Sequence, residues 1–171
     1  PEAWAERLGG RALPTGTVRL EEAAGIADLP GYDEGAWWVQ DAAAALPVRM
    51  LGDVAGRTVV DLCAAPGGKT ADDIARLAET QNRLLAAAAT MVAPGGRLLY
   101  CVCSLEAEEG PRQVERFLAA QSAFRLEPAA RLSGGDEFLT PEGALRTLPC
   151  QWPEWGGLDG FFAALFRRRA A

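Results

Sequence analysis

A short glycine-containing stretch, Asp61 to Thr70, has residue types that suit a cofactor-binding loop. It follows the β-branched, apolar run Arg57–Leu62, which predicts a buried parallel strand. Small residues at the carboxyl end of such a strand let a ligand approach backbone amides and the N-terminus of the next helix. An ordinary strand-to-helix turn is the alternative that a lone Pro-Gly-Gly leaves open. The loop residues we assign to cofactor binding are Cys63, Ala64, Ala65, Pro66, Gly67, Gly68 and Lys69.

The end of this loop, Gly68-Lys69-Thr70, also matches the end of a phosphate-binding P-loop. However, Cys63 stands where that motif has its first glycine, and no later predicted strand ends in an acidic residue for magnesium. A P-loop-like nucleotide-binding protein is therefore the weaker hypothesis.

Four cysteines and no histidine restrict the possible catalytic chemistry. Without histidine, this chain alone cannot form a Ser-His-Asp triad, a Cys-His pair or a histidine-containing zinc site. Cys101 and Cys103 are close, whereas Cys63 and Cys150 stand singly, so the spacing disfavours a four-thiolate zinc site and we expect no metal. By itself, Cys103 is either a nucleophile or a small buried apolar side chain.

Composition indicates one globular domain, and its net negative charge indicates that the chain does not attract nucleic acid through an overall positive charge. The chain has 171 residues, of which 49% are hydrophobic, and a formal net charge of -6. This balance argues against a chain that mainly grips phosphate backbones, although Arg167-Arg168-Arg169 forms a local basic cluster. We find no signal peptide and no apolar span of about 20 residues, and therefore expect a protein of the cytoplasm with no membrane partner. The sequence does not determine the oligomeric state, and a monomer is favoured.

The elements that would position the loop and the cysteine alternate between strand and helix. Apolar residues at helical spacing predict a helix from Asp72 to Val92, and Leu98–Cys103 reads as a second buried strand. Pro111 opens another helix, and Phe161–Phe166 reads as an antiparallel strand at the sheet edge. This order predicts an α/β layered domain.

Before the first predicted strand the pattern is weaker. We expect an irregular arm with one short strand at Thr17–Leu20, and helical material over Trp37–Leu51 that Pro47 kinks. Trp37 and Trp38 are either core residues or a surface on which bases stack. We place an N-terminal arm and lead-in segment at 1–35 and a catalytic domain at 36–171.

The stretch Asp61–Thr70 resembles the adenosylmethionine-binding loop of the Sun family of RNA cytosine-5 methyltransferases. Three further stretches fall in the family's order. These are Pro30–Asp41, Pro94–Tyr100 leading into Cys103-Ser104, and Asp159–Phe162. The resemblance implies a Rossmann-like methyltransferase sheet with helices on both faces, S-adenosyl-L-methionine as cofactor, and RNA, in particular ribosomal RNA, as substrate.

The resemblance also implies a role for Cys103, which aligns with the family's nucleophile. Such a cysteine adds to carbon 6 of cytosine, and carbon 5 then accepts the methyl group. Cys101 is assigned to the core. A degenerate methyltransferase fold that only binds RNA or a ribosomal partner is the non-enzyme alternative.

The sequence departs from the family between Ala71 and Asp72. The family has further strand and helix units there, including an Asp-Ala-Pro-Cys motif and a ribose-binding carboxylate, and none of these occurs here. At roughly 30 residues per strand-helix-strand unit, about 80 to 90 residues are absent. Either the chain carries a true deletion, or a segment of the natural protein between 71 and 72 is not in this sequence. We favour the second, because a deletion would expose apolar faces of a parallel sheet.

Overall fold

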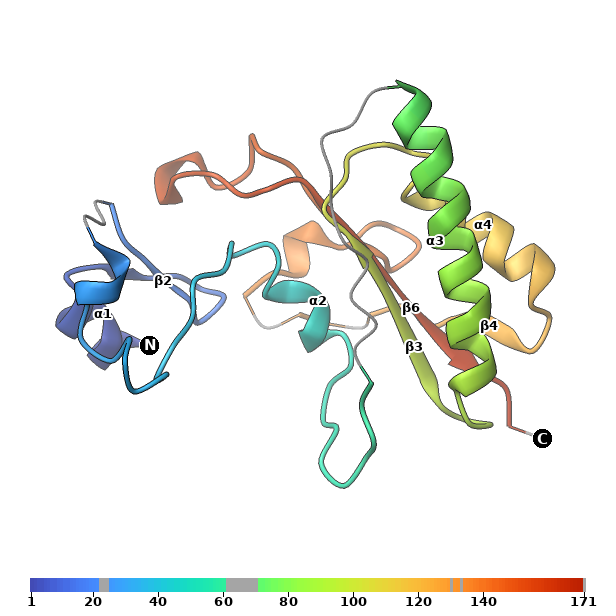
Figure 1. The fold of residues 1–171 in the computed structure, drawn as a ribbon, viewed down its shortest axis with the longest axis horizontal. Coiled ribbons are helices and arrows are strands. Elements are labelled where there is room, and N and C mark those ends of the chain that lie inside the picture. Colours follow the sequence, from blue (N-terminus) through green and yellow to red (C-terminus); the bar gives the residue numbers. More distant parts are fainter. Residues whose placement is uncertain (22–24, 61–70, 130, 133, 171) are drawn as a thin grey trace.

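The computed structural model describes residues 1–21, 25–60, 71–129, 131–132 and 134–170 (Figure 1). Within these ranges the secondary structure is mixed. The helices are α1 (Glu2–Leu8), α2 (Leu46–Arg49), α3 (Ala71–Met91) and α4 (Pro111–Ala120), with 3-10 turns η1 (Ile26–Asp28), η2 (Asp136–Phe138) and η3 (Pro153–Trp155). The strands are β1 (Arg11–Ala12), β2 (Val18–Arg19), β3 (Arg97–Val102), β4 (Phe124–Leu126), β5 (Leu145–Thr147) and β6 (Phe161–Arg168).

The main sheet is built around its last strand, β6. β3 pairs along one side of β6, and β4 and β5 pair with the other side, all antiparallel. The expectation that Phe161–Phe166 lies at the sheet edge is therefore wrong, because β6 is central. The five residues 162–166 are all buried, as a strand covered on both faces requires.

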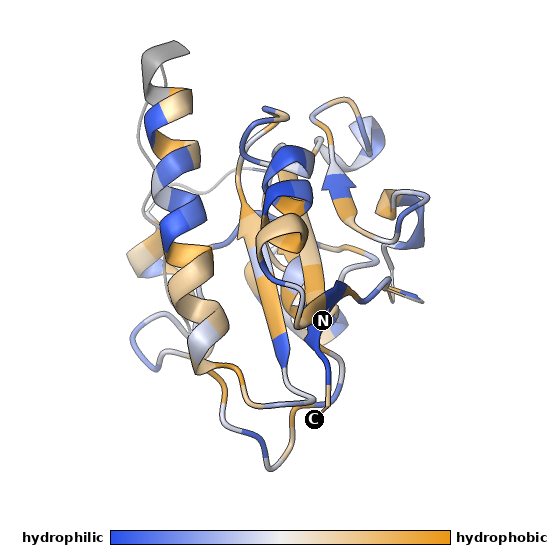
Figure 2. Ribbon diagram, turned by 90° about the vertical axis from the view of Figure 1, so that its right-hand side faces the viewer, coloured by the Kyte–Doolittle hydropathy of each residue, from blue (hydrophilic) through white to orange (hydrophobic). Residues whose placement is uncertain are grey.

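Alternation along β6 separates two hydrophobic cores. Phe162, Ala164 and Phe166 face α3 and α4, where they pack with Leu85 and Phe117. Their neighbours Ala163 and Leu165 point to the opposite face, which is covered by α2 and by the loops around η2. In Figure 2 the sheet strands are hydrophobic over most of their length. The layered α/β fold predicted from the sequence is thus confirmed.

The helices α3 and α4 confirm the two helices predicted from the apolar spacing and from Pro111. α3 begins at Ala71, so residues 71 and 72 lie in one helix, and the turn after it leads into β3. α4 begins with Pro111 and buries Phe117, which is 2% exposed. The Phe117 ring meets the Phe124 ring edge-on and lies tilted against the Phe166 ring. Proline suits the first turn because the missing N–H has no partner there.

The N-terminal part departs from the expectation. The predicted strand at 17–20 is present as β2, paired with β1, but the arm also contains α1, which sequence periodicity did not indicate. Residues 37–45 are not helical, and only α2 represents the expected helix over 37–51. Asp41 instead accepts a hydrogen bond from the Ala43 amide, a turn that begins the chain's approach to α2.

The strand expected over 57–62 is wrong for its described part, because residues 57–60 form no strand. Val59 and Val60 are 58% and 64% exposed. A buried parallel strand needs neighbours on both sides, but in the main sheet the described strands β3, β4 and β5 all pair with β6 instead. The remaining residues of that strand, 61 and 62, lie outside the described ranges.

Candidate active site

Cys103 directly follows β3, and its side chain is exposed. The alternative of a buried, inert thiol therefore does not describe this structure. Cys101 is also exposed, so its assignment to the core is wrong. Its partner across the sheet, Ala163, is fully buried. β3 is the outer strand, so Cys101 is covered from one neighbouring strand only.

The predicted cofactor loop, Cys63 to Lys69, lies outside the described residues. The chain that follows it enters α3. A hollow of about 340 Å³ lies at the beginning of this helix, lined by Ile74, Ala75, Glu106 and Glu108. Glu106 is three residues beyond Cys103. The helix that follows the loop and the segment that follows the cysteine are thus brought together.

Behind Cys103, Ser104 and Glu109 form a buried polar pair. Ser104 Oγ donates a hydrogen bond of 2.8 Å to Glu109 Oε2 and accepts one from the Glu106 amide. Gln81 of α3 donates to the other carboxylate oxygen of Glu109 at 2.6 Å. Glu109 is only 1% exposed. The pair therefore ties the segment after the cysteine to α3.

Tyr100 of β3 closes the same network. Its hydroxyl donates to the Glu109 carbonyl oxygen at 2.6 Å and lies 3.1 Å from Gln81 Oε1. Burial raises the pKa of this phenol well above its ordinary value of 10.0, and the charges of Glu109 and Cys101 raise it further. Tyr100 is therefore a neutral hydrogen-bond donor over the physiological range.

Sequence reasoning missed this network. In the sequence alone, Glu106, Glu108 and Glu109 look alike, as charged residues that lead into the helix opened by Pro111. In the structure only Glu109 turns inward, while Glu108 forms an exposed ion pair with Arg112. Pro111 at the start of α4 was the available signal, because a residue just before a helix entry is positioned by the turn that leads into it.

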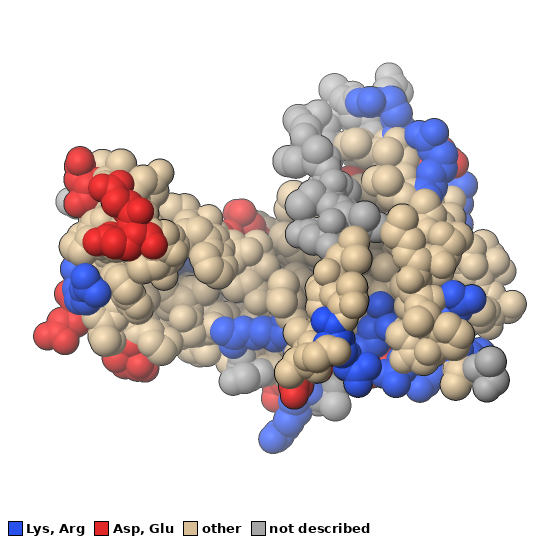
Figure 3. Space-filling view, turned by 60° about the horizontal axis from the view of Figure 1, so that its bottom comes forward, with Lys and Arg blue, Asp and Glu red and all other residues tan. Residues whose placement is uncertain are grey.

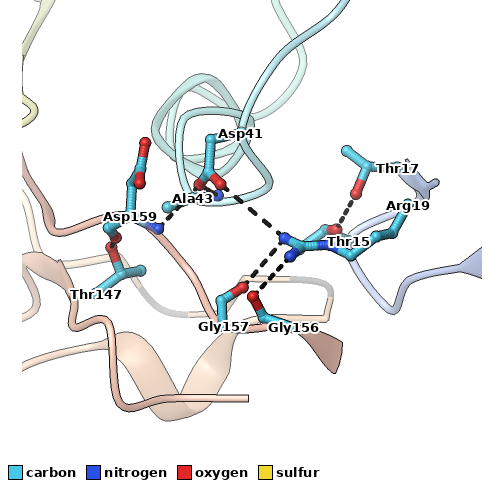
Figure 4. Close-up of polar contacts among 9 residues, drawn as sticks. All are labelled: Thr15, Thr17, Arg19, Asp41, Ala43, Thr147, Gly156, Gly157 and Asp159. Carbon is cyan, nitrogen blue, oxygen red and sulfur yellow. Dashed lines mark hydrogen bonds and ion pairs between the residues drawn. The ribbon is translucent and has the colours of Figure 1, made fainter. Parts of the chain in front are cut away.

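Asp41 connects the N-terminal part to the segment that precedes β6 (Figure 4). Its Oδ1 accepts hydrogen bonds from the amides of Ala43, at 2.7 Å, and Asp159, at 3.2 Å. Its Oδ2 lies 4.0 Å from Arg19 Nη2, and Arg19 also donates to the carbonyls of Gly156 and Gly157. Asp159 lies just before β6, so one carboxylate joins β2, the lead-in to α2 and the start of β6.

The two tryptophans ahead of Asp41 are not core residues. Trp38 is 77% exposed, and its Nε1 donates to Gln40 Oε1. Trp37 is half-buried and donates to the Pro30 carbonyl at 2.9 Å. Both line a hollow of about 740 Å³ in the N-terminal part. Base stacking on Trp38 stays a prediction.

The described part of the chain contains neither a cluster of metal ligands nor a membrane-spanning helix. No group of three or more His, Cys, Asp or Glu side chains there is arranged to hold a metal ion. None of the helices in the same ranges is both long and apolar enough to span a membrane.

Comparison with known proteins identifies the family of this chain. A profile described as 16S rRNA methyltransferase RsmB/F matches residues 70–167, which is more than half of the chain. The chain belongs to this family. The resemblance predicted from the sequence is confirmed.

Individual relatives agree. Ribosomal RNA small subunit methyltransferase B of Vibrio cholerae is 26% identical over 231 residues, covering 88% of this chain and 50% of the relative. The protein of the same name from Thermus thermophilus is 41% identical over 98 residues, covering 57% of this chain and 22% of the relative. A solved structure, a methyltransferase homolog from Pyrococcus horikoshii, is 30% identical with a TM-score of 0.46, covering 58% of this chain and 33% of that chain.

The chain spans about half the length of several curated relatives that it matches. In the Vibrio cholerae alignment of 231 residues, 88% of this 171-residue chain amounts to about 150 residues, so about 80 positions have no residue here. In the alignment with the protein of the same name from Xanthomonas campestris, however, 159 residues cover 91% of this chain, or about 156 residues, so almost no position lacks a residue here. The absence of about 80 to 90 residues stays a prediction, and so does its position between 71 and 72.

Proposed function

We propose that this protein transfers a methyl group from S-adenosyl-L-methionine to carbon 5 of a cytosine in ribosomal RNA, with Cys103 as the nucleophile. The observation that carries the proposal is the exposed Cys103 at the end of β3, in a chain of the RsmB/F family. The relatives are named as small-subunit ribosomal RNA methyltransferases, which supports the substrate class.

The reaction requires a nucleophile because carbon 5 of cytosine reacts poorly with electrophiles. The Cys103 thiolate adds to carbon 6, and the displaced π electrons make carbon 5 nucleophilic. Bound adenosylmethionine supplies the electrophilic methyl group. A base then removes the proton from carbon 5, and the returning electron pair expels the Cys103 thiolate. The exposure of Cys103 supports this role, because a buried thiol could not reach the cytosine ring of an RNA substrate.

The described residues near the predicted loop are compatible with the cofactor. Glu106 lines the hollow at the start of α3 and is exposed, and a carboxylate suits a cationic sulfonium. Gly67 and Gly68, which would allow close approach to the backbone, lie outside the described ranges. The cofactor assignment of Cys63–Lys69 therefore rests on the sequence motif.

The experiment compares two neighbouring exposed cysteines. Methyl transfer from radiolabelled adenosylmethionine to a small-subunit ribosomal RNA transcript is measured for the parent chain, Cys103→Ser and Cys101→Ser. Cys103→Ser should lower turnover by on the order of 10³-fold or more, as loss of a nucleophile does, and should still bind the cofactor in a calorimetric titration. Cys101→Ser should stay close to the parent.

Retained turnover in Cys103→Ser would refute the nucleophile assignment. A chain that binds RNA but gives no calorimetric signal with adenosylmethionine would instead be the non-catalytic module. The intact mass should be measured on the same sample, because a polypeptide heavier than the 18.1 kDa of these residues would show that the natural protein carries more chain.

A further inference from the structure

Three arginines form a row across three strands at one end of the main sheet. Arg97 of β3 lies directly opposite Arg167 of β6, and Arg167 lies directly opposite Arg125 of β4. Directly opposed residues project to the same face of a sheet, and like charges in these positions are destabilising. This arginine row, Arg97, Arg125 and Arg167, is therefore unfavourable for the fold unless an anion offsets its charge.

The protein supplies one such anion, Glu127. Arg97 donates to Glu127 Oε1 from Nη2 at 2.6 Å and from Nε at 3.1 Å, and Arg167 Nη1 lies 3.6 Å from Oε2. The hydrogen bond from Arg97 lowers the pKa of Glu127, and the charges of Arg167 and Arg125 act in the same direction. Among the residues that the structure describes, this one carboxylate faces three guanidinium groups, so the row keeps an excess of positive charge.

Arg125 is the member of the row whose side chain is accessible to a ligand. Its side chain is exposed, and it forms no hydrogen bond or ion pair with any residue that the structure describes. Arg97 is held more firmly, since its Nη1 also donates to the Leu51 carbonyl. The row thus combines a fixed arginine with one that is available to a ligand.

The surroundings of the row are basic, although the chain as a whole has a net charge of -6. Arg168 and Arg169 follow Arg167 directly and donate to the carbonyls of Val92 and Ser122. In Figure 3, Lys and Arg side chains gather on the sheet side of the molecule, and Asp and Glu side chains gather on the N-terminal side. The side of the molecule that carries the main sheet is therefore the more basic one in this view, and it complements a polyanion.

We propose that the arginine row binds the phosphodiester backbone of the RNA substrate at nucleotides outside the target cytosine. Cys103 is six residues beyond Arg97, a distance of roughly 20 Å at about 3.3 Å per strand residue. The row therefore contacts phosphates of nucleotides other than the one at the thiol. The choice of RNA among polyanions rests on the proposed function. Arginine suits this role because its planar group binds phosphate oxygens in pairs.

The test is the salt dependence of RNA binding by the full chain. Fluorescence anisotropy of a labelled single-stranded RNA, taken from the small-subunit ribosomal sequence, is recorded between about 50 and 200 mM KCl. Arg125→Gln should weaken binding several-fold at low salt and lower the slope of log K against log salt by about one. Arg83→Gln, at an exposed arginine of α3 on the other layer, is the matched control and should change neither value.

Glu127→Gln distinguishes an RNA-binding role of the row from a purely structural role of its ion pairs. It should tighten RNA binding, because Arg97 and Arg167 lose their competing carboxylate, while lowering the stability of the fold. An ion-pair network without a binding role predicts only the loss of stability. Unchanged RNA affinity in this variant, or an Arg125→Gln slope equal to that of the parent, would overturn the proposal.

One control tests whether the row binds RNA or an acidic protein surface, and a second separates this proposal from the proposed function. Poly-L-glutamate should compete with the RNA poorly, and competition as strong as that of unlabelled RNA would assign the row to an acidic protein surface instead. Binding is measured without methyl transfer. If the chain is inactive but its RNA binding depends on Arg125 as predicted, the proposed methyltransferase function is refuted and RNA binding by the arginine row is not. If the chain is active and its RNA binding does not depend on Arg125, only the proposal for the arginine row is refuted.

Discussion

Ser104 donates from Oγ to Glu109 Oε2 at 2.8 Å, and both side chains are buried. Because Ser104 is bonded to Cys103, this contact fixes one side of the residue that carries the proposed nucleophile. The other side is fixed by β3, in which Val102 pairs with Phe162. The thiol is thus exposed while its backbone is held between two ordered segments.

Replacing Glu109 should destabilise the fold. In Glu109→Gln the remaining oxygen accepts hydrogen bonds more weakly than a carboxylate. The new NH2 group takes the place of the other oxygen, where it faces a group that donates in the parent, either Ser104 Oγ or Gln81 Nε2. The free energy of unfolding should fall by about 1–3 kcal/mol, the usual effect on a buried hydrogen bond to a charged group. Urea denaturation followed by circular dichroism measures it.

The adjacent Glu108 is the matched control. Its ion pair with Arg112 is largely exposed, so Glu108→Gln should change stability by about 0.5 kcal/mol or less. Ser104→Ala, which removes the contact from the other side, should follow Glu109→Gln. Equal, small effects in all three variants would contradict the role of the buried pair.

Tyr100 makes stability fall at high pH. Its phenol has a raised pKa in the folded chain, so the folded state keeps the proton that the unfolded chain releases near pH 10. Stability is therefore fully present below pH 10 and is lost as the pH rises above it. Urea midpoints between pH 8 and pH 11 measure the loss.

Tyr100→Phe should be less stable than the parent at pH 8, because the Glu109 carbonyl loses its donor, and its midpoint should fall less steeply above pH 10. In a Tyr32→Phe background, Tyr100 is the one phenol left of the two in the sequence, and its absorbance reports its ionisation directly. Ionisation near pH 10 in the folded chain would show that Tyr100 is not buried.

Asp41 should control the attachment of the N-terminal part. Asp41→Ala removes the acceptor of the Asp159 amide and the carboxylate beside Arg19. Trypsin should then cleave after Arg11 and Arg19 several-fold faster, which mass spectrometry of the fragments would show. Asp53→Ala is the control, since the carboxylate of Asp53 accepts a local hydrogen bond from the Ala55 amide, two residues away. Equal cleavage rates in the two variants would argue against this attachment.

Thiol reactivity checks the exposure of Cys103 without any substrate. In a variant with the other three cysteines replaced by serine, the single thiol should react with Ellman's reagent within about an order of magnitude of the urea-unfolded rate, because reactivity follows access. Protection by several orders of magnitude would indicate the buried alternative.

Local patterns in the sequence predicted local structure well. α3 and α4 follow from apolar spacing and from Pro111, and β3 follows from an apolar run between turns. The central place of β6 was not predictable, because it depends on three strands distant in sequence. The strand expected over 57–62 failed for a related reason, since a buried strand exists only when its neighbours are present.

The site was predicted in part. Motif and position singled out Cys103, but they could not show that Cys101 is exposed as well or that Glu109 turns inward. Both depend on what lies opposite in space. The arginine row has the same origin, because Arg97, Arg125 and Arg167 become neighbours only through strand register.

The position of β6 has a consequence for how the protein is made. β3, β4 and β5 pair with β6 and not with one another, yet they are all synthesised before it. During translation they remain without partners, with their backbone groups and apolar side chains open to aggregation, until residue 168 has left the ribosome. Helix α3, whose hydrogen bonds are local, can form earlier, so assembly of the main sheet waits for the synthesis of β6.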